Sequence, residues 1–102
     1  MRQAKIFVHG KEAGYLKELD NKKYSFTYLD DYTGHPVSLS MPIEKKVYAF
    51  DSFPPFFDGL LPEGFQLEAL LKKHKIDRRD YFTQLVTVGG DLVGAVTVEE
   101  VK

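Results

Sequence analysis

Three glycines near the end of the chain, Gly89, Gly90 and Gly94, come nearest to a phosphate-binding motif. A phosphate cradle needs a strand, a glycine-rich turn and then a helix N-terminus, whose free N–H groups face the anion. Here the glycines lead into the apolar run 92–98, which predicts a strand. The sequence therefore favours a turn at this place over a nucleotide site.

The other side chains able to do chemistry lack the spacing that a site requires. The adjacent carboxylates at 30–31 do not form a calcium loop, and the serines at 38 and 40 lie outside a nucleophile-elbow sequence. No carboxylate pair is singled out as an acid–base couple. The histidines are far apart and show no paired-ligand spacing: His9, His35 and His74. We predict no catalytic residue, no metal site and no cofactor.

One basic cluster follows an apolar helical stretch: Lys72, Lys73, His74, Lys75, Arg78 and Arg79. Cations at the end of a helix complement its dipole, but they also bind phosphates or acidic partners. The net charge of -1 provides no global field that would attract nucleic acid or anionic lipid. We favour a solvated helix end, with a protein contact and then a nucleic-acid contact as the alternatives.

The bulk composition predicts a single domain over residues 1–102. Eight Phe, six Tyr and a 43% hydrophobic content are enough for a core, and the absence of Cys excludes disulfides and thiolate–metal sites. Residues 1–10 lack the apolar region of a signal peptide, and no stretch approaches the roughly 20 apolar residues that span a bilayer. We therefore expect a cytoplasmic protein with no membrane partner.

The first half of the chain predicts β-strands. Residues 24–29 alternate Tyr24, Phe26 and Tyr28 on one face with smaller side chains on the other. Glycines at 10 and 14 bracket a polar stretch and predict a hairpin turn. The expected strands are 5–8, 15–19, 24–29 and a short extended segment at 37–41, with turns at 9–14 and 20–22.

A helix is expected from Ser52, which can act as its N-cap. Phe53, Pro54 and Pro55 would fill the first turn, where the N–H groups have no partner within the helix and proline is tolerated. An apolar stripe then follows at helical spacing: Phe53, Phe56, Phe57, Leu60 and Leu61. Pro62 would end this helix.

Two more helices and a strand complete the prediction. A helix over 63–74 carries Leu67, Leu70, Leu71 and His74 on one face. Asp77 would cap a short third helix with Tyr81, Phe82, Leu85 and Val86, before the strand at 92–98. The order predicts an α+β fold: a small, mainly antiparallel, barrel-like sheet followed by two to three short helices and a final strand.

Phe65 departs from the amphipathic pattern of its helix. It lies about 160° from Leu67 around the helix axis, on the side opposite the leucine stripe. A bulky aromatic there is a candidate interface anchor. Alternatively, it folds back onto neighbouring aromatics such as Phe56 and Phe57, and the sequence leaves both possibilities open.

Four segments together resemble the N-terminal subdomain of HipA-type kinases, the toxins of bacterial persistence modules. They occur in the family's order: the opening strand with its Gly10…Gly14 hairpin, Leu39-Ser40-Met41-Pro42, residues 56–64 (Phe-Phe-Asp-Gly-Leu-Leu-Pro-Glu-Gly), and residues 90–96 (Gly-Asp-Leu-Val-Gly-Ala-Val). The resemblance implies that a much larger kinase body, with the ATP-binding loop and catalytic aspartates, follows this subdomain in single-chain relatives. None of that body is present here, so the resemblance carries over no kinase activity.

A free-standing copy of this subdomain resembles HipS, the small subunit of tripartite HipB–HipS–HipT systems. The resemblance implies an antitoxin that binds a HipT-like Ser/Thr kinase, with a separate HipB-like DNA-binding protein in a ternary complex. The alternative is a subdomain excised from a single-chain HipA-like kinase, which would pack on its own kinase body. Position 65 is not part of the shared signature.

We expect the helix pair around residues 61–71 to contact the kinase, with Phe65 as an aromatic plug near its active-site cleft. The predicted partner-binding residues are Leu61, Pro62, Glu63, Gly64, Phe65, Glu68, Ala69 and Lys72. Because this domain lacks the kinase body, we expect no enzymatic activity.

Overall fold

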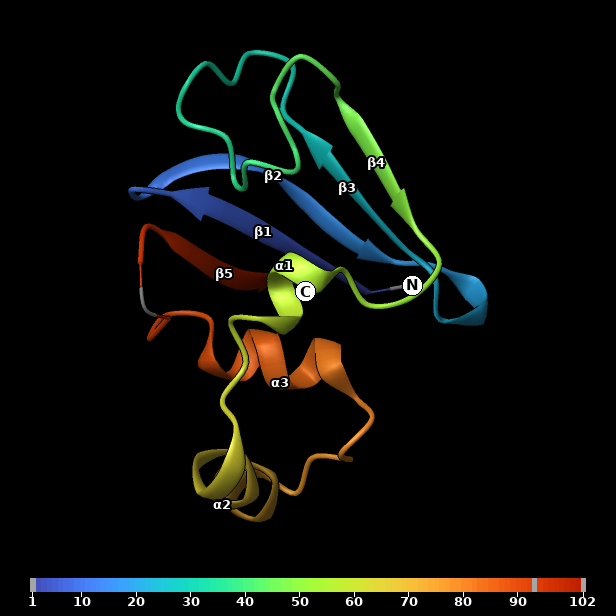
Figure 1. Cartoon of the computed structure of the whole chain (residues 1–102), viewed down its shortest axis with the longest axis vertical. Coiled ribbons are helices and arrows are strands. Elements are labelled where there is room, and N and C mark those ends of the chain that lie inside the picture. The colour runs from blue at the N-terminus through green and yellow to red at the C-terminus, as the bar shows by residue number, and fades with distance from the viewer. Residues whose placement is uncertain (1, 93, 102) are drawn as a thin grey trace.

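The computed structural model describes residues 2–92 and 94–101, and its strands form one open antiparallel sheet in the order β4-β3-β2-β1-β5 (Figure 1). The strands are β1 (Arg2–Val8), β2 (Lys11–Glu18), β3 (Tyr24–Tyr28), β4 (Val47–Phe50) and β5 (Val96–Val101). The helices are η1 (Asp20–Lys22), α1 (Pro55–Asp58), α2 (Gly64–His74) and α3 (Tyr81–Val88). The α+β class and the antiparallel sheet are confirmed.

The expected barrel-like closure is wrong, because β4 and β5 stand at opposite edges of the sheet. The free edge of β5 is met by the end of α3, where the Val98 N–H donates to the Gly89 carbonyl at 2.9 Å. A Cβ on Gly89 would lie 2.1 Å from the Val98 carbonyl oxygen, so this approach depends on glycine. The helix end thus takes the place that a neighbouring strand would need.

The first hairpin turns more tightly than the two glycines indicated. His9 and Gly10 both have positive φ, 52° and 79°, which suits a two-residue turn, and β2 begins at Lys11. Gly14 therefore lies inside β2 and not in the turn, and a Cβ there would come within 2.2 Å of the Thr27 carbonyl oxygen. The predicted alternation in β3 is confirmed, since Tyr24, Phe26 and Tyr28 are buried.

The segment between β3 and β4 differs from the expectation. Residues 37–41 are not extended but turn back on themselves, with a bridge between Ser38 and Met41. The Tyr28 hydroxyl holds this turn, because it donates to the Met41 carbonyl and accepts from the Val37 N–H. The strand β4, which pairs with β3, was not predicted.

The first helix is shorter than predicted and does not start at Ser52. Pro54 is its N-cap with ψ of 132°, and α1 ends at Asp58, before Pro62. A residue that precedes a proline is disfavoured in the helical backbone conformation. Phe53 precedes Pro54 and Pro54 precedes Pro55, so neither Phe53 nor Pro54 belongs to the helix. The apolar stripe still packs inward, since Phe53 and Phe57 are buried.

The second helix is confirmed, and the start of the third is corrected. In α2, Leu71 is buried while His74 is exposed. Asp80, not Asp77, caps α3, because its carboxylate accepts from the Thr83 N–H at 3.2 Å. Asp77 accepts from the Arg79 N–H at 2.7 Å in the preceding turn.

The final strand begins later than predicted, at 96 and not at 92. Val93, which belongs to both the predicted strand and the 90–96 motif, lies outside the described residues. Among the described residues, no helix has the length and apolar character needed to cross a bilayer.

One face of the sheet carries the core. It buries side chains from four strands, the β3–β4 connection and the helices, among them Ile6, Leu16, Phe26, Met41, Phe57, Phe82, Leu85 and Val98. Figure 1 shows α1 and α3 on this side, with α2 beyond α3 at the end of the molecule. This arrangement leaves most of α2 in solvent.

Candidate partner-binding surface

The connection from α1 to α2 is a corner with a defined backbone. The Leu60 and Leu61 N–H groups donate to the Phe57 and Asp58 carbonyls, each at 3.1 Å. Glu63 is the N-cap of α2 with extended backbone, and Gly64 follows with φ of +59°. Because a side chain is strained at this φ, glycine permits the abrupt start of α2.

Phe65 lies in the first turn of α2 and points into solvent, with 95% of its surface exposed. Phe56 and Phe57 instead form an edge-to-face pair at 5.2 Å between ring centroids. The structure therefore excludes the alternative in which Phe65 folds back onto them. It retains the outward orientation that the helical wheel indicated.

Phe65 is the first member of an exposed stripe along α2, which we call the outer stripe: Phe65, Glu68, Ala69 and Lys72. Their spacing of three, four and seven positions places them on one face of a helix, and all four are exposed. Leu61 and Pro62, in contrast, are half-buried at the corner, next to the exposed Glu63 and Gly64. The predicted residues thus form two adjoining parts, the corner and the outer stripe.

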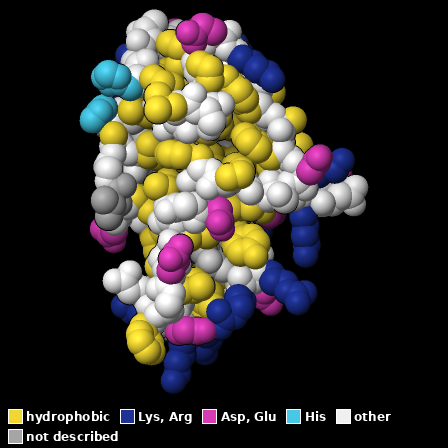
Figure 2. Space-filling model, viewed as in Figure 1, with side chains coloured by type: hydrophobic (Ala, Val, Ile, Leu, Met, Phe, Trp, Pro, Cys, Tyr) yellow, Lys and Arg dark blue, Asp and Glu magenta, His cyan; other side chains and the backbone are white. Residues whose placement is uncertain are grey.

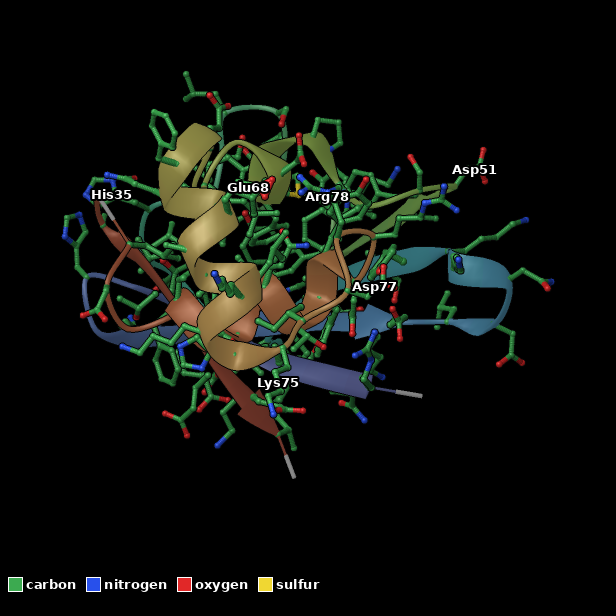
Figure 3. The ribbon with its side chains drawn as sticks, turned by 90° about the horizontal axis from the view of Figure 1, so that it is seen from below. His35, Asp51, Glu68, Lys75, Asp77 and Arg78 are labelled. Carbon is green, nitrogen blue, oxygen red and sulfur yellow. The ribbon has the colours of Figure 1, made fainter. Side chains whose placement is uncertain are left out.

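Glu68 is already engaged within the chain. The Arg78 guanidinium donates to its carboxylate, with 2.6 Å between Nη2 and Oε2, and Figure 3 shows the two side chains beside each other. This hydrogen bond raises the pKa of Arg78, although both side chains are more than half exposed. A solvent-exposed pair of this kind stabilises little, and a partner can reorganise it.

The basic cluster occupies the other end of α2. Lys72, Lys73 and His74 form its last turn, and Lys75 follows in the left-handed conformation with its N–H bonded to the Leu71 carbonyl. Figure 2 shows Lys and Arg side chains gathered at the end of the molecule where α2 lies. The position agrees with cations complementing a helix C-terminus, and it leaves a protein contact open.

A groove that the sequence did not indicate lies beside the corner; we call it the corner groove. It has a volume of about 770 Å³ and is lined by Gly59, Leu60, Leu61, Pro62, Glu63, Gln66, Val88, Asp91 and Leu92. The lining joins the α1–α2 connection to the end of α3. The only hint of this groove in the sequence is that apolar Val88 and Leu92 flank the Gly89-Gly90 turn. Their positions in the sequence do not show which residues they face.

A second cleft of about 620 Å³ lies at the opposite end of α3, next to a polar cluster around Arg2. Arg2 donates to Glu18 and to Asp80, and the Tyr24 hydroxyl donates to Glu18 at 2.8 Å. Hydrogen bonds from Arg2 hold the pKa of Glu18 below its usual value. Because these groups satisfy one another, the cluster fastens α3 to the sheet.

In the described part of the chain, neither the glycine turn nor a cluster of metal ligands forms a site for a small ligand. The turn at 89–90 leads into β5, as predicted, and Gly89 packs against Val98 without facing a helix N-terminus. Within residues 2–92 and 94–101, no group of three His, Cys, Asp or Glu side chains is placed to hold a metal ion. The corner and the outer stripe therefore remain the candidate site.

Comparisons with known proteins place this geometry in context. Residues 4–99 match the family described as HipA N-terminal domain. A solved structure described as the N-terminal domain of HipA toxin superposes with a TM-score of 0.79 at 34% identity, covering 100% of this chain and 94% of that chain.

Two relatives differ in how much of them the chain covers. An uncharacterized protein of Haemophilus influenzae is 37% identical over 102 residues, covering 100% of this chain and 95% of that protein. A Sinorhizobium fredii protein named "Putative kinase Y4mE" is 34% identical over 73 residues, which are 72% of this chain and 17% of that protein.

Proposed function

The chain belongs to the HipA N-terminal domain family, and we propose that it is a HipS-like antitoxin that binds a HipT-like Ser/Thr kinase toxin and holds it inactive. The observation that carries this proposal is the 95% exposure of Phe65. Phe65 lies at the start of α2, which is separated from the sheet by α3 (Figure 1). The domain itself would catalyse no reaction, and it would act only by binding the kinase.

Burying Phe65 against a partner makes free energy available for binding. A phenylalanine held in water gains about 1.5–3 kcal/mol when a partner buries it. Aromatic anchors of this kind dominate interface energetics when less important contacts surround them and exclude water. Ala69 and the aliphatic stems of Glu68 and Lys72, on the same stripe, provide such surroundings.

The resemblance to HipS implies the remaining parts of the system, and the near-neutral charge of the domain agrees with them. With a net charge of -1, the domain has no global field that would attract the DNA phosphate backbone. A separate HipB-like protein would bind the operator DNA and form a ternary complex with the kinase and this chain in the cytoplasm.

Co-expression of the chain with the HipT-like kinase encoded beside it tests this proposal. We expect growth rescue and co-purification with the wild-type chain. Phe65→Ala should lose about 2 kcal/mol of binding free energy, which is roughly a 30-fold rise in Kd. Leu39→Ala is the matched control, because Leu39 is equally exposed, at 96%, but lies in the β3–β4 connection. Unchanged rescue and affinity for Phe65→Ala would contradict the plug.

A second candidate function is that of an N-terminal subdomain packed on its own kinase body. The match to a segment that makes up 17% of the Y4mE protein favours this candidate, because the rest of that protein lies outside the match. The same corner and outer stripe would then form an intramolecular contact. Sequencing the gene distinguishes the two functions, since a reading frame that continues into a kinase body supports the second.

A further inference from the structure

The corner groove has an apolar floor and a polar rim. The floor is formed by half-buried side chains from two separate segments: Leu60, Leu61, Pro62, Val88 and Leu92. Of these, Leu60, Leu61 and Leu92 pack against the core from below, which fixes their positions. The exposed rim consists of Glu63, Gln66 and Asp91. An apolar floor within a polar rim is the usual anatomy of a protein-binding site.

The charge on the rim has one sign. Glu63 and Asp91 are carboxylates, and the residues that line the groove include no Lys, Arg or His. Within the described part of the chain, neither carboxylate lies in an ion pair. Figure 2 shows acidic side chains on the face between α1 and α2, whereas the basic cluster lies at the far end of α2.

The groove also adjoins the proposed plug. Glu63 and Gln66 lie on either side of the Gly64–Phe65 pair in the sequence, and Gln66 is about 100° from Phe65 around α2. A partner that buries Phe65 is therefore brought to the rim of the groove. The two features differ in chemistry, since Phe65 is a projecting aromatic and the groove is a recess with negative charge.

We infer that the corner groove receives an apolar segment of the kinase that carries a Lys or Arg, whose cation meets Glu63 and Asp91 while its neighbours cover the leucine floor. This inference rests on the proposed function, because it assigns the occupant to the same partner. The groove volume of about 770 Å³ suits a short peptide segment inserted from a larger surface. Phe65 and the groove thus form a projection and a recess, and this combination sets the orientation of the complex.

The test measures the affinity of the full-length chain for the purified kinase as a function of salt. We expect Asp91→Arg to raise Kd on the order of tenfold at low salt and to flatten the salt dependence. Asp91 is exposed, and its own N–H, which bonds to the Val88 carbonyl at 2.8 Å, is unaffected by the substitution. Asp31→Arg, a charge reversal at another exposed position, in the β3–β4 connection, is the control and should change little.

A second variant tests the recess itself. Gln66→Trp places a large side chain at the rim from an exposed helical position, and it should weaken binding on the order of tenfold. Lys73→Trp, exposed near the other end of α2, is its control. Circular dichroism and thermal unfolding establish that all four variants are folded.

The outcomes separate the two proposals. If the wild type binds the kinase and Phe65→Ala weakens it, but Asp91→Arg and Gln66→Trp do not, the groove inference is wrong and the antitoxin function stands. If the wild type does not bind the kinase, both are wrong. If sedimentation shows a wild-type dimer that Asp91→Arg dissociates, the occupant is a second copy of this chain, and the groove inference is wrong.

Discussion

Arg2 in β1 and Asp80 at the start of α3 are 78 positions apart in the sequence and are joined by an ion pair of 2.9 Å between Nη2 and Oδ1. Arg2 also forms a two-point contact with Glu18, at 2.7 and 2.8 Å. One guanidinium thereby connects the first strand, the second strand and the last helix. Arg2 additionally lies over the ring of Phe82, which is buried in the core.

Replacing Arg2 should destabilise the fold. Arg2→Met retains the aliphatic stem but leaves Glu18 and Asp80 without their shared cation, and we expect the free energy of unfolding to fall by about 2 kcal/mol. Urea denaturation followed by circular dichroism measures this change. Arg79→Met is the matched control, because Arg79 is exposed in the turn before α3, and it should shift the free energy by less than about 0.5 kcal/mol. Equal effects of the two variants would mean that the cluster does not fasten the helix.

Acid should unfold the wild-type chain partly through the same cluster. Burial disfavours the charged form of Asp80, but hydrogen bonds from Arg2 and Thr83 outweigh this effect and lower the pKa of Asp80. A hydrogen bond from Arg2 lowers the pKa of Glu18 as well. The stability these groups contribute is present above their unfolded pKa values of about 4 and is lost as the pH falls through their lower folded values. Thermal unfolding from pH 7 to pH 2 checks this. Arg2→Met should show a smaller drop in Tm than the wild type, and a parallel drop would contradict the assignment.

The Gly89–Val98 contact should tolerate no side chain. In Gly89→Ala the new Cβ would lie 2.1 Å from the Val98 carbonyl oxygen, a backbone atom that cannot move without disturbing β5. We expect a loss of about 3 kcal/mol in the free energy of unfolding. Gly90→Ala is the control, since a Cβ there meets nothing within 4 Å, and it should be nearly neutral. Hydrogen exchange at the Val98 N–H, which bonds to the Gly89 carbonyl, reports the same change locally.

Phe57, inside the family motif at 56–64, and Phe65, just beyond it, should behave in opposite ways. Phe57 is fully buried and lies 6.3 Å from Phe26 between ring centroids, so Phe57→Ala should cost about 3–5 kcal/mol of stability. Phe65→Ala removes a side chain that touches solvent and should alter stability by less than about 0.5 kcal/mol. Chemical denaturation of both variants provides the comparison. A large loss for Phe65→Ala would show that Phe65 packs within the domain and would remove the basis for the plug.

Local periodicity was enough for the elements whose pattern repeats. The alternation of Tyr24, Phe26 and Tyr28 indicated β3, and the leucine spacing indicated α2 with Phe65 on its outer side. The start of the first helix was predicted wrongly, because the tolerance of proline in a first turn was considered without its effect on the preceding residue. The effect of a proline on the residue before it, applied at both Pro54 and Pro55, would have placed the start of α1 at Pro55 and not at Ser52.

The sequence by itself determined the class of the fold, the family resemblance and the outward face of α2, because these depend on the pattern and order of residues along the chain. Only the tertiary structure decided that Arg2 meets Asp80, that Gly89 meets Val98, and that Val88, Asp91 and Leu92 form a groove with the α1–α2 corner. The first and third of these relationships join segments that are distant in the chain, and the second brings the end of α3 against the strand that follows it. Such contacts depend on how helices are placed over the sheet, and no local pattern records that placement.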